Sequence, residues 1–362
     1  MQYYGLETCL QVLFDQFSPL NAAQTRRLAH LTTGTLLAGN TALRKVARQL
    51  SSTSQQDSRV RWLSRTLQAP WLSQTVVYQA LIRQALAGYH AATLHIVLDR
   101  TTPAEPTTDL LSATLSFRGR AVPLAWEFMS HGRSGAAQHQ RLLARCHALL
   151  PPNRRVVVHG DSEFGSVALM RDIRRRGWQF ILGISGSYAY RQATHNDWQK
   201  LSDLPITRQQ SFYLNDVVLT RTHAYHPVGV FAFYHPRYAN RRRRADIRYC
   251  ATSMRTSPAV RRVGRRRWSI ECCFKDFKSS GWQLHQSQLT HKRRRHGLQV
   301  VLSIAYLWSI CVGRWLEKRG RRSQIDSQRQ PRQLSLFRIG WDYIVHTFRN
   351  SGKLPAILTL YS

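Results

Sequence analysis

The chain has 362 residues, of which 43% are hydrophobic, enough to bury a core and to fold as a globular protein. Lysine and arginine number 53 against 19 aspartates and glutamates, which gives a formal net charge of +34. Natural small domains usually carry a net charge of about 2 to 8, so this excess predicts a polyanionic partner and indicates nucleic acid. The six cysteines form no CxxC pair, which excludes a zinc-finger pattern and a disulfide framework and indicates reduced thiols.

The sequence carries no signal that predicts export or membrane insertion. The N-terminus, MQYYGLETCL, lacks the charged start and apolar stretch of a secretory signal. The apolar run at 298–312 is interrupted by Gln299, Ser303 and Ser309 and is shorter than the roughly 18 residues of a spanning segment. We therefore expect a cytoplasmic protein that makes no contact with a membrane.

Residues 1–90 are predicted to form a helical module. Leu43, Val46, Ala47 and Leu50 are apolar at helical spacing, and the polar stretch SSTSQQDS at 51–58 separates them from a second helical segment, RVRWLSRTLQ. Short helices that carry arginines are typical of a module that binds DNA ends, although an ordinary helical bundle has the same pattern.

The residues at 91–185 are predicted to form a mixed α/β unit. TLHIVLD and the two runs around the turn at Arg118-Gly119-Arg120 read as three strands, and AAQHQRLLARCHALL reads as a helix. RRVVVHGD, SVALMRDIRRRG and WQFILGIS then predict strand, helix and strand. The order of three strands, helix, strand, helix and strand predicts a mixed sheet.

Three further segments follow. Residues 186–255 contain short aromatic and branched runs between polar turns and predict a β-rich insertion. Residues 256–318 read as helical, and 319–362 read as a basic tail with a polar arginine/glutamine segment followed by a C-terminal helix.

Two aspartates stand where apolar strands are predicted to end. Asp99 closes LHIVLD and Asp161 closes RVVVHGD. Either residue alone is better explained as a turn or cap residue, but two carboxylates at equivalent strand ends in so basic a chain favour a ligand site at the edge of the sheet.

A third acid, Glu271, lies within the basic stretch RRRWSIECCFKDFK at 265–278. On a helix, Arg267, Glu271 and Lys278 share one face, next to an apolar stripe, while Asp276 falls on the opposite side and is expected to be solvated. An intrahelical ion pair with Arg267 or Lys275 would also account for Glu271. Three converging carboxylates would bind divalent magnesium, and two such ions can promote phosphodiester cleavage.

These residues resemble the signature of the DDE transposases of bacterial insertion sequences, and the insertion sequence 4 family in particular. Asp99, an Asp-x-x-Phe at Asp161 and an Arg-x3-Glu-x6-Lys at Arg267, Glu271 and Lys278 carry the resemblance, which covers roughly 90–320. The sequence departs from that pattern at Gly264, where the family usually has tyrosine.

The resemblance implies an RNase H-like domain whose first and fourth strands are neighbours, with Asp99, Asp161 and Glu271 as catalytic residues and ligands of Mg²⁺, which Mn²⁺ can replace. It implies cut-and-paste DNA transposition: cleavage at the terminal inverted repeats of the element and strand transfer into target DNA. It also implies a bacterial, nucleoid-associated protein that forms a homodimer in its synaptic complex.

The remaining basic residues are predicted to bind DNA phosphates, although they would also suit solvated surfaces. They are Arg265, Arg266, Lys275, the four consecutive arginines Arg241, Arg242, Arg243 and Arg244, and the run at 292–295. A non-catalytic DNA-binding repressor derived from a transposase, and a metal-dependent nuclease without strand transfer, are the alternative functions that the sequence leaves open.

Overall fold

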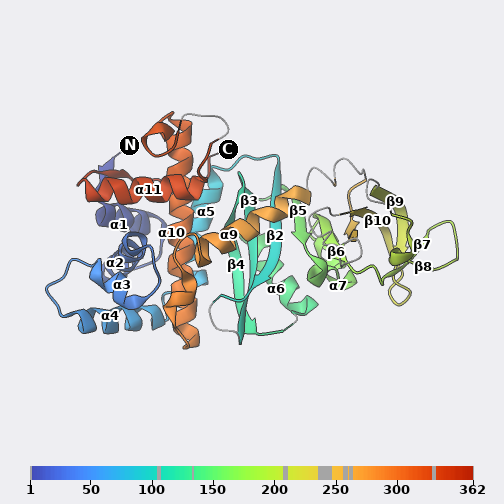
Figure 1. Ribbon diagram of the computed structural model, residues 1–362, viewed down its shortest axis with the longest axis horizontal. Helices are drawn as coiled ribbons and strands as arrows, with labels where there is room; N and C mark the ends of the chain where they lie inside the picture. The colour runs from blue at the N-terminus through green and yellow to red at the C-terminus, as the bar shows by residue number, and fades with distance from the viewer. Residues whose placement is uncertain are drawn as a thin grey trace, which may run out of the picture.

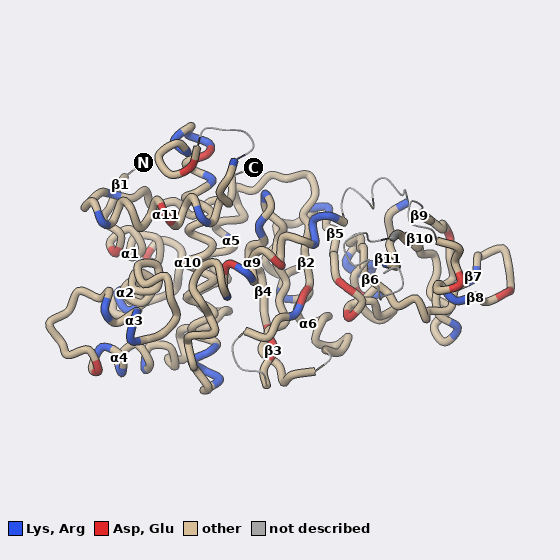
Figure 2. Tube along the Cα trace, viewed as in Figure 1, with Lys and Arg blue, Asp and Glu red and all other residues tan. Residues whose placement is uncertain are grey.

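The computed structural model describes residues 2–103, 107–132, 134–206, 211–234, 247–255, 260, 264–327 and 332–361. The molecule is elongated, with helices at one end, a large sheet in the middle and a β-rich part at the other end (Figure 1). Lysine and arginine are spread over all of these parts, while acidic residues are sparse (Figure 2).

The secondary structure follows the predicted order. The helices are α1 Leu6–Phe17, α2 Ala22–Ala38, α3 Leu43–Arg48, α4 Gln56–Gln68, α5 Gln79–Ala87, α6 Ala136–His147, α7 Val167–Arg175, α9 Trp268–Lys278, α10 Lys292–Lys318 and α11 Leu336–Arg349. The strands are β1 Tyr3–Tyr4, β2 Thr93–Thr101, β3 Thr108–Phe117, β4 Arg120–Ser130, β5 Arg155–Gly160, β6 Gln179–Ile184, β7 Ala189–Gln192, β8 Gln199–Lys200, β9 Ser211–Leu219, β10 Tyr225–Tyr234, β11 Ile247–Thr252 and β12 Leu354–Pro355.

The central sheet has the mixed topology expected of an RNase H-like fold. Its first five strands lie in the order β4-β3-β2-β5-β6, with β2, β3 and β4 antiparallel and β2, β5 and β6 parallel. The first and fourth strands of the unit are therefore neighbours. Val97 of β2 pairs with His159 of β5, and continuing this register by two residues on each strand places Asp99 beside Asp161.

The predicted β-rich region continues this sheet. Strand β11 pairs with β6 through Tyr249 and Ile184, and β10, β9, β7 and β8 follow in that order, so the sheet has ten strands among the described residues. The β strands of residues 186–255 thus share a hydrogen-bonded edge with the central sheet.

Helix α10 runs through the helical end of the molecule and also packs on the central sheet. It contacts α2, α4, α5, α11 and β4 (Figure 1). In the part of the chain that the structure describes, it is the one helix long and apolar enough to cross a membrane, and 94% of that apolar window is buried inside the protein. The helix is longer than the interrupted apolar run suggested, and its apolar side chains face other helices and the sheet.

The helical end combines segments from both ends of the chain. Helices α1–α5 pack with α10 and α11, and the short strands β1 and β12 pair through Tyr3 and Pro355. Helix α2 begins with a capping box, in which Asn21 accepts from the N–H of Gln24 and the side chain of Gln24 accepts from the N–H of Asn21. The sequence predicts the break between α3 and α4, because the serines and glutamines of this segment do not continue an apolar helix face.

Candidate active site

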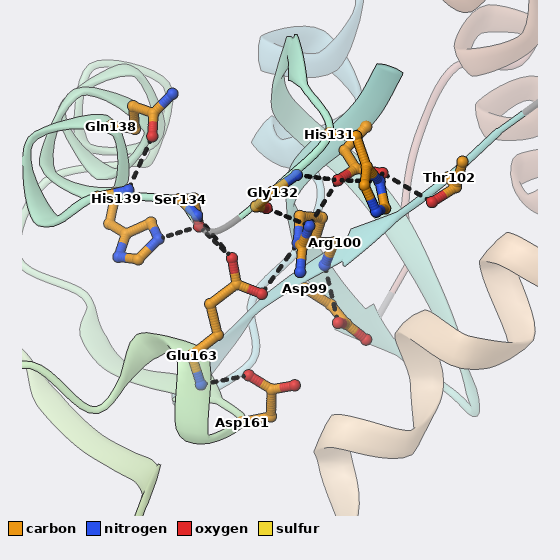
Figure 3. A network of polar contacts seen from close by, with 12 residues as sticks. Asp99, Arg100, Thr102, His131, Gly132, Ser134, Gln138, His139, Asp161 and Glu163 are labelled. Carbon is orange, nitrogen blue, oxygen red and sulfur yellow. Dashed lines mark hydrogen bonds and ion pairs between the residues drawn. The ribbon is translucent and has the colours of Figure 1, made fainter. Parts of the chain in front are cut away.

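Asp99 and Asp161 lie next to one another toward the carboxyl ends of β2 and β5 (Figure 3). The prediction that Asp99 closes its strand was wrong by two residues, because β2 continues to Thr101 through its pairing with β3, whereas Asp161 directly follows β5. Each carboxylate accepts a hydrogen bond from a backbone N–H one or two residues further along the chain. The N–H of Arg100 donates to Asp99 Oδ1 at 2.8 Å, and the N–H of Glu163 donates to Asp161 Oδ1 at 2.9 Å. Asp161 is the N-cap of the short 3₁₀ turn at 162–164, so its turn role and its place in the acidic group are compatible.

Glu271 reaches this edge from α9, which crosses the sheet beside β2, β3 and β4. Its Oε1 accepts from Arg267 Nη2 at 2.8 Å, and Arg267 Nη1 lies 3.8 Å from Asp99 Oδ2. The intrahelical ion pair considered from the sequence is therefore present, and the same guanidinium links Glu271 to Asp99. Ile270, Cys273 and Phe277 form the buried stripe that fixes the helix on the sheet.

The charge at this site is incompletely balanced. Burial raises the pKa of Asp99 from 3.8 to about 6; the hydrogen bond from Arg100 and the charge of Arg267 lower it, and the charges of Asp161 and Glu271 raise it. The carboxylates thus repel one another in a partly dry environment, and a cation at this edge would stabilise their ionised forms.

The three carboxylates supply the hard oxygen donors that magnesium and manganese prefer. Among the described residues, no group of three or more histidine, cysteine, aspartate or glutamate side chains is already gathered closely enough to hold a metal ion. Glu271 is instead held by Arg267, whose guanidinium occupies the position between Glu271 and Asp99. The donor set fits a divalent ion, provided that Glu271 exchanges this partner for the metal.

A polar network that the sequence did not predict lies beside the two aspartates (Figure 3). Arg100 Nε donates to Glu163 Oε2 at 3.0 Å, and Arg100 also pairs with Asp109, whose side chain is 1% exposed. Thr102 Oγ1 donates to Asp109 Oδ1 at 2.7 Å, and His131 Nδ1 lies 3.2 Å from the same carboxylate. Burial would raise the pKa of Asp109, but hydrogen bonds from Thr102, His131 and Arg100 lower it below its usual value.

The other end of this network is anchored on the segment between β4 and α6. Ser134 donates both its N–H, at 3.0 Å, and its hydroxyl to Glu163 Oε1. The Ser134 hydroxyl also lies 2.6 Å from His139 Nε2 on α6. Both carboxylate oxygens of Glu163 therefore already accept hydrogen bonds from protein groups.

The predicted basic residues surround α9. Lys278 is half-buried; burial lowers the pKa of its amine, while the charges of Asp109 and Asp99 raise it, which places the amine near the acidic edge. Arg265, Arg266 and Lys275 are exposed. Arg241, Arg242, Arg243 and Arg244 lie outside the described residues.

A shallow hollow of about 310 Å³ lies at the start of α9 and is lined by Ser116, Gly119, Arg265, Arg266, Trp268 and Ser269. Trp268 is 54% exposed, the most of the four exposed large hydrophobic residues among those that the structure describes. An aromatic face flanked by two arginines suits a nucleotide, because bases stack on aromatic rings and phosphates pair with guanidinium groups.

The prediction that Asp276 is solvated was wrong. Its side chain is buried, with Arg120 Nε of β4 at 2.9 Å and the Tyr306 hydroxyl of α10 at 3.0 Å. The helical rotation correctly placed Asp276 away from Arg267, but α10 and β4 cover that second face of α9. Asp276 therefore has a structural role, since it links three elements.

The strand order of the central sheet, together with the helices that alternate with its later strands, defines an RNase H-like α/β protein. Residues 130–308, just under half of the chain, match the family model of the transposase DDE domain. This match includes Asp161 and Glu271 and begins after Asp99. A comparison with curated proteins gives no match.

Two solved structures show weaker likenesses. The piggyBac transposase synaptic complex with hairpin DNA is 10% identical, with 97% of this chain and 88% of that chain covered and a TM-score of 0.42. The Mos1 strand transfer complex is 14% identical, with 48% of this chain and 56% of that chain covered and a TM-score of 0.19. At these scores neither likeness bears on the function of this chain.

Proposed function

We propose that this protein is a DDE transposase that cleaves DNA at the ends of its element and joins them to target DNA in a metal-dependent, cut-and-paste reaction. One observation carries the proposal. Asp99 and Asp161 are in register on the neighbouring strands β2 and β5, and Arg267 links Asp99 to Glu271 on the helix that covers this edge. The match of residues 130–308 to the transposase DDE domain supports the same reading.

Asp99, Asp161 and Glu271 are the residues that would hold a divalent ion, with Mg²⁺ as the expected metal and Mn²⁺ as a substitute. When bound, such ions activate a water or a 3′-hydroxyl and stabilise the leaving oxygen of a phosphodiester. The protein would contribute rigid placement of the donors, since Asp99 is part of the paired strand β2, Asp161 directly follows β5, and both accept backbone hydrogen bonds.

The basic residues around α9 would bind the phosphates of the DNA. Arg265, Arg266 and Lys275 are exposed on α9 or directly before it, and Lys278 lies at the end of the same helix. Arg267 would exchange Glu271 for a phosphate when the metal binds, because a guanidinium pairs with either anion. We include the arginines at 241–244 among the proposed phosphate-binding residues because of their charge alone.

The partners that the proposal names are the terminal inverted repeats of the element, target DNA and a second copy of the chain. Pairing two DNA ends requires two sites, which favours a homodimer in the synaptic complex. A bacterial insertion sequence of the insertion sequence 4 family and a nucleoid location are part of the same proposal.

The test is cleavage and joining by the purified chain. Duplexes that carry the ends of the encoding element are incubated with Mg²⁺ or Mn²⁺, and the products are resolved by size. We expect 3′-hydroxyl ends and joined products with the wild type, and loss of both with Asp99→Ala. Asp342→Ala is the control, because Asp342 pairs with Arg338 on α11, away from the acidic edge.

Three outcomes separate the candidate functions. Cleavage without joining would favour a nuclease. Tight DNA binding without cleavage, unchanged by Asp99→Ala, would favour a repressor. Cleavage and joining that survive Asp99→Ala would exclude the proposed site.

A further inference from the structure

The two aspartates are connected to each other through the protein as well as across the strands. The residue whose N–H donates to Asp99 is Arg100, and the residue whose N–H donates to Asp161 is Glu163. The side chains of these same two residues form an ion pair, Arg100 Nε to Glu163 Oε2, at 3.0 Å. The backbone N–H of Arg100 thus binds Asp99, the backbone N–H of Glu163 binds Asp161, and the ion pair between Arg100 and Glu163 joins these two contacts (Figure 3).

This connection is not a loose surface contact. The side chains of Arg100 and Glu163 are 24% and 15% exposed, and each has a second partner within the protein. Arg100 also pairs with the buried Asp109, and Glu163 also accepts both donors of Ser134. A network in which Arg100 and Glu163 each make several hydrogen bonds fixes the positions of both side chains, because moving one breaks several of them.

Glu163 itself is poorly placed to be a metal ligand. Its Oε2 accepts from Arg100 and its Oε1 accepts from Ser134, so binding a cation would require breaking these contacts. Its contribution is therefore to geometry.

We propose that Arg100 and Glu163 are positioning residues that set the spacing of the Asp99 and Asp161 carboxylates, and that their ion pair thereby tunes the affinity of the site for a divalent cation. The inference rests on the proposed function, in which these carboxylates hold the metal. Residues that orient metal ligands commonly change metal affinity by about 10 to 100-fold when they are replaced. An ion pair that served the fold alone would leave metal affinity unchanged.

The experiment measures binding of Mn²⁺ alone to the full chain by calorimetry and by electron paramagnetic resonance. Glu163→Gln keeps the size of the side chain and the N–H to Asp161 but removes the charge that pairs with Arg100. We expect it to weaken Mn²⁺ binding about tenfold and to change the resonance of the bound ion. Glu127→Gln is the matched control. Glu127 lies on β4 and pairs with Arg141 of α6 at 2.9 Å, outside the network, so this variant should bind Mn²⁺ as the wild type does.

Two more variants make the result decisive. Ser134→Ala removes one donor to Glu163 and should weaken Mn²⁺ binding about threefold; it decides the question if Glu163→Gln does not fold. Asp161→Asn tests the site itself. If it abolishes binding while Glu163→Gln and Ser134→Ala bind as the wild type does, the positioning role is wrong and the proposed function stands. If Asp161→Asn also binds normally, both are wrong.

Discussion

Arg267 holds a positive charge between Asp99 and Glu271, where the proposed metal would bind. Because the guanidinium competes with a cation for the same oxygens, Arg267→Ala should tighten Mn²⁺ binding in the absence of DNA. A half-exposed ion pair contributes about 1 kcal/mol at most, so the expected gain is about fivefold. Calorimetry with Mn²⁺ measures it, and Arg338→Ala, which removes the similar i,i+4 ion pair to Asp342, is the control.

The same variant should bind DNA less tightly, since it lacks one phosphate-binding group, and the two effects have opposite signs. Weaker Mn²⁺ binding by Arg267→Ala would mean that the arginine supports the metal site instead of competing with it.

The contacts within the site differ in how well the sequence predicts them. Glu271 and Arg267 are four positions apart, so helical geometry alone predicts their contact. Arg100, Ser134 and Glu163 are far apart in the chain, and no local spacing predicts that they meet. Only the pairing of β2 with β5 and the path of the chain between β4 and α6 bring them together.

At the scale of the elements, helices α10 and α11 cross at a point where each helix contributes a glycine. A Cβ on Gly340 would lie 1.8 Å from the carbonyl oxygen of Ser309, and one on Gly313 would lie 2.0 Å from that of Leu336. Backbone atoms cannot move aside without separating the helices. Gly340→Ala should therefore lower the free energy of unfolding by about 1 to 3 kcal/mol, measured by urea denaturation.

The control for this crossing is Gly5→Ala, because a Cβ on Gly5 would have no neighbour within 4 Å. Equal stability of Gly340→Ala and the wild type would mean that α10 and α11 do not pack as closely as described.

Strands β2 and β5 also carry a histidine pair, of which His159 is buried and His95 half-buried. Burial lowers the pKa of His159 to about 3 and that of His95 to about 4, and their rings are 3.2 Å apart between His95 Nδ1 and His159 Nε2. In the unfolded chain both titrate near pH 6.5. Between pH 6.5 and about 3 the unfolded chain thus binds more protons than the folded one, so stability is complete above pH 6.5 and falls as the pH is lowered.

For His159 alone this loss amounts to about 2 kcal/mol between pH 6.5 and pH 5. Urea denaturation at pH 7.5 and at pH 5 measures it. His159→Leu should lose less stability on acidification than the wild type, and His291→Gln, at an exposed position, should lose as much as the wild type does. An identical acid response of His159→Leu would show that this histidine does not limit stability.

The elements of the fold were largely predictable because each has a local pattern. The strands β2 and β5 contain apolar runs, and α6 and α7 have apolar residues at helical spacing. Which strands are neighbours was less predictable. The pairing of β11 with β6, which extends the sheet into the β-rich region, depends on contacts between residues about 70 positions apart, as between Phe180 and Thr252, and no local pattern contains them.

At the scale of the whole molecule, the net charge of +34 predicts DNA binding that depends strongly on salt. A protein that contacts 6 to 10 phosphates loses about 10³ to 10⁵ in affinity between 50 and 200 mM salt. Fluorescence anisotropy with a labelled duplex, without metal, would give the slope of log affinity against log salt. A loss of less than about tenfold over this range would contradict a large phosphate contact.

The same titration can locate part of that contact on the helical end. Arg61 and Arg65 are exposed one turn apart on α4, and Asp57 is the only acid between residues 16 and 98. If both arginines bind phosphates, Arg61→Ala with Arg65→Ala should reduce the magnitude of the salt slope by about 2. Arg338→Ala with Arg349→Ala removes the same charge from α11, on the other side of the helical end in Figure 1, and should leave the slope unchanged. Equal slopes for the two double variants would mean that charge alone, and not the α4 surface, determines how the helical end meets DNA.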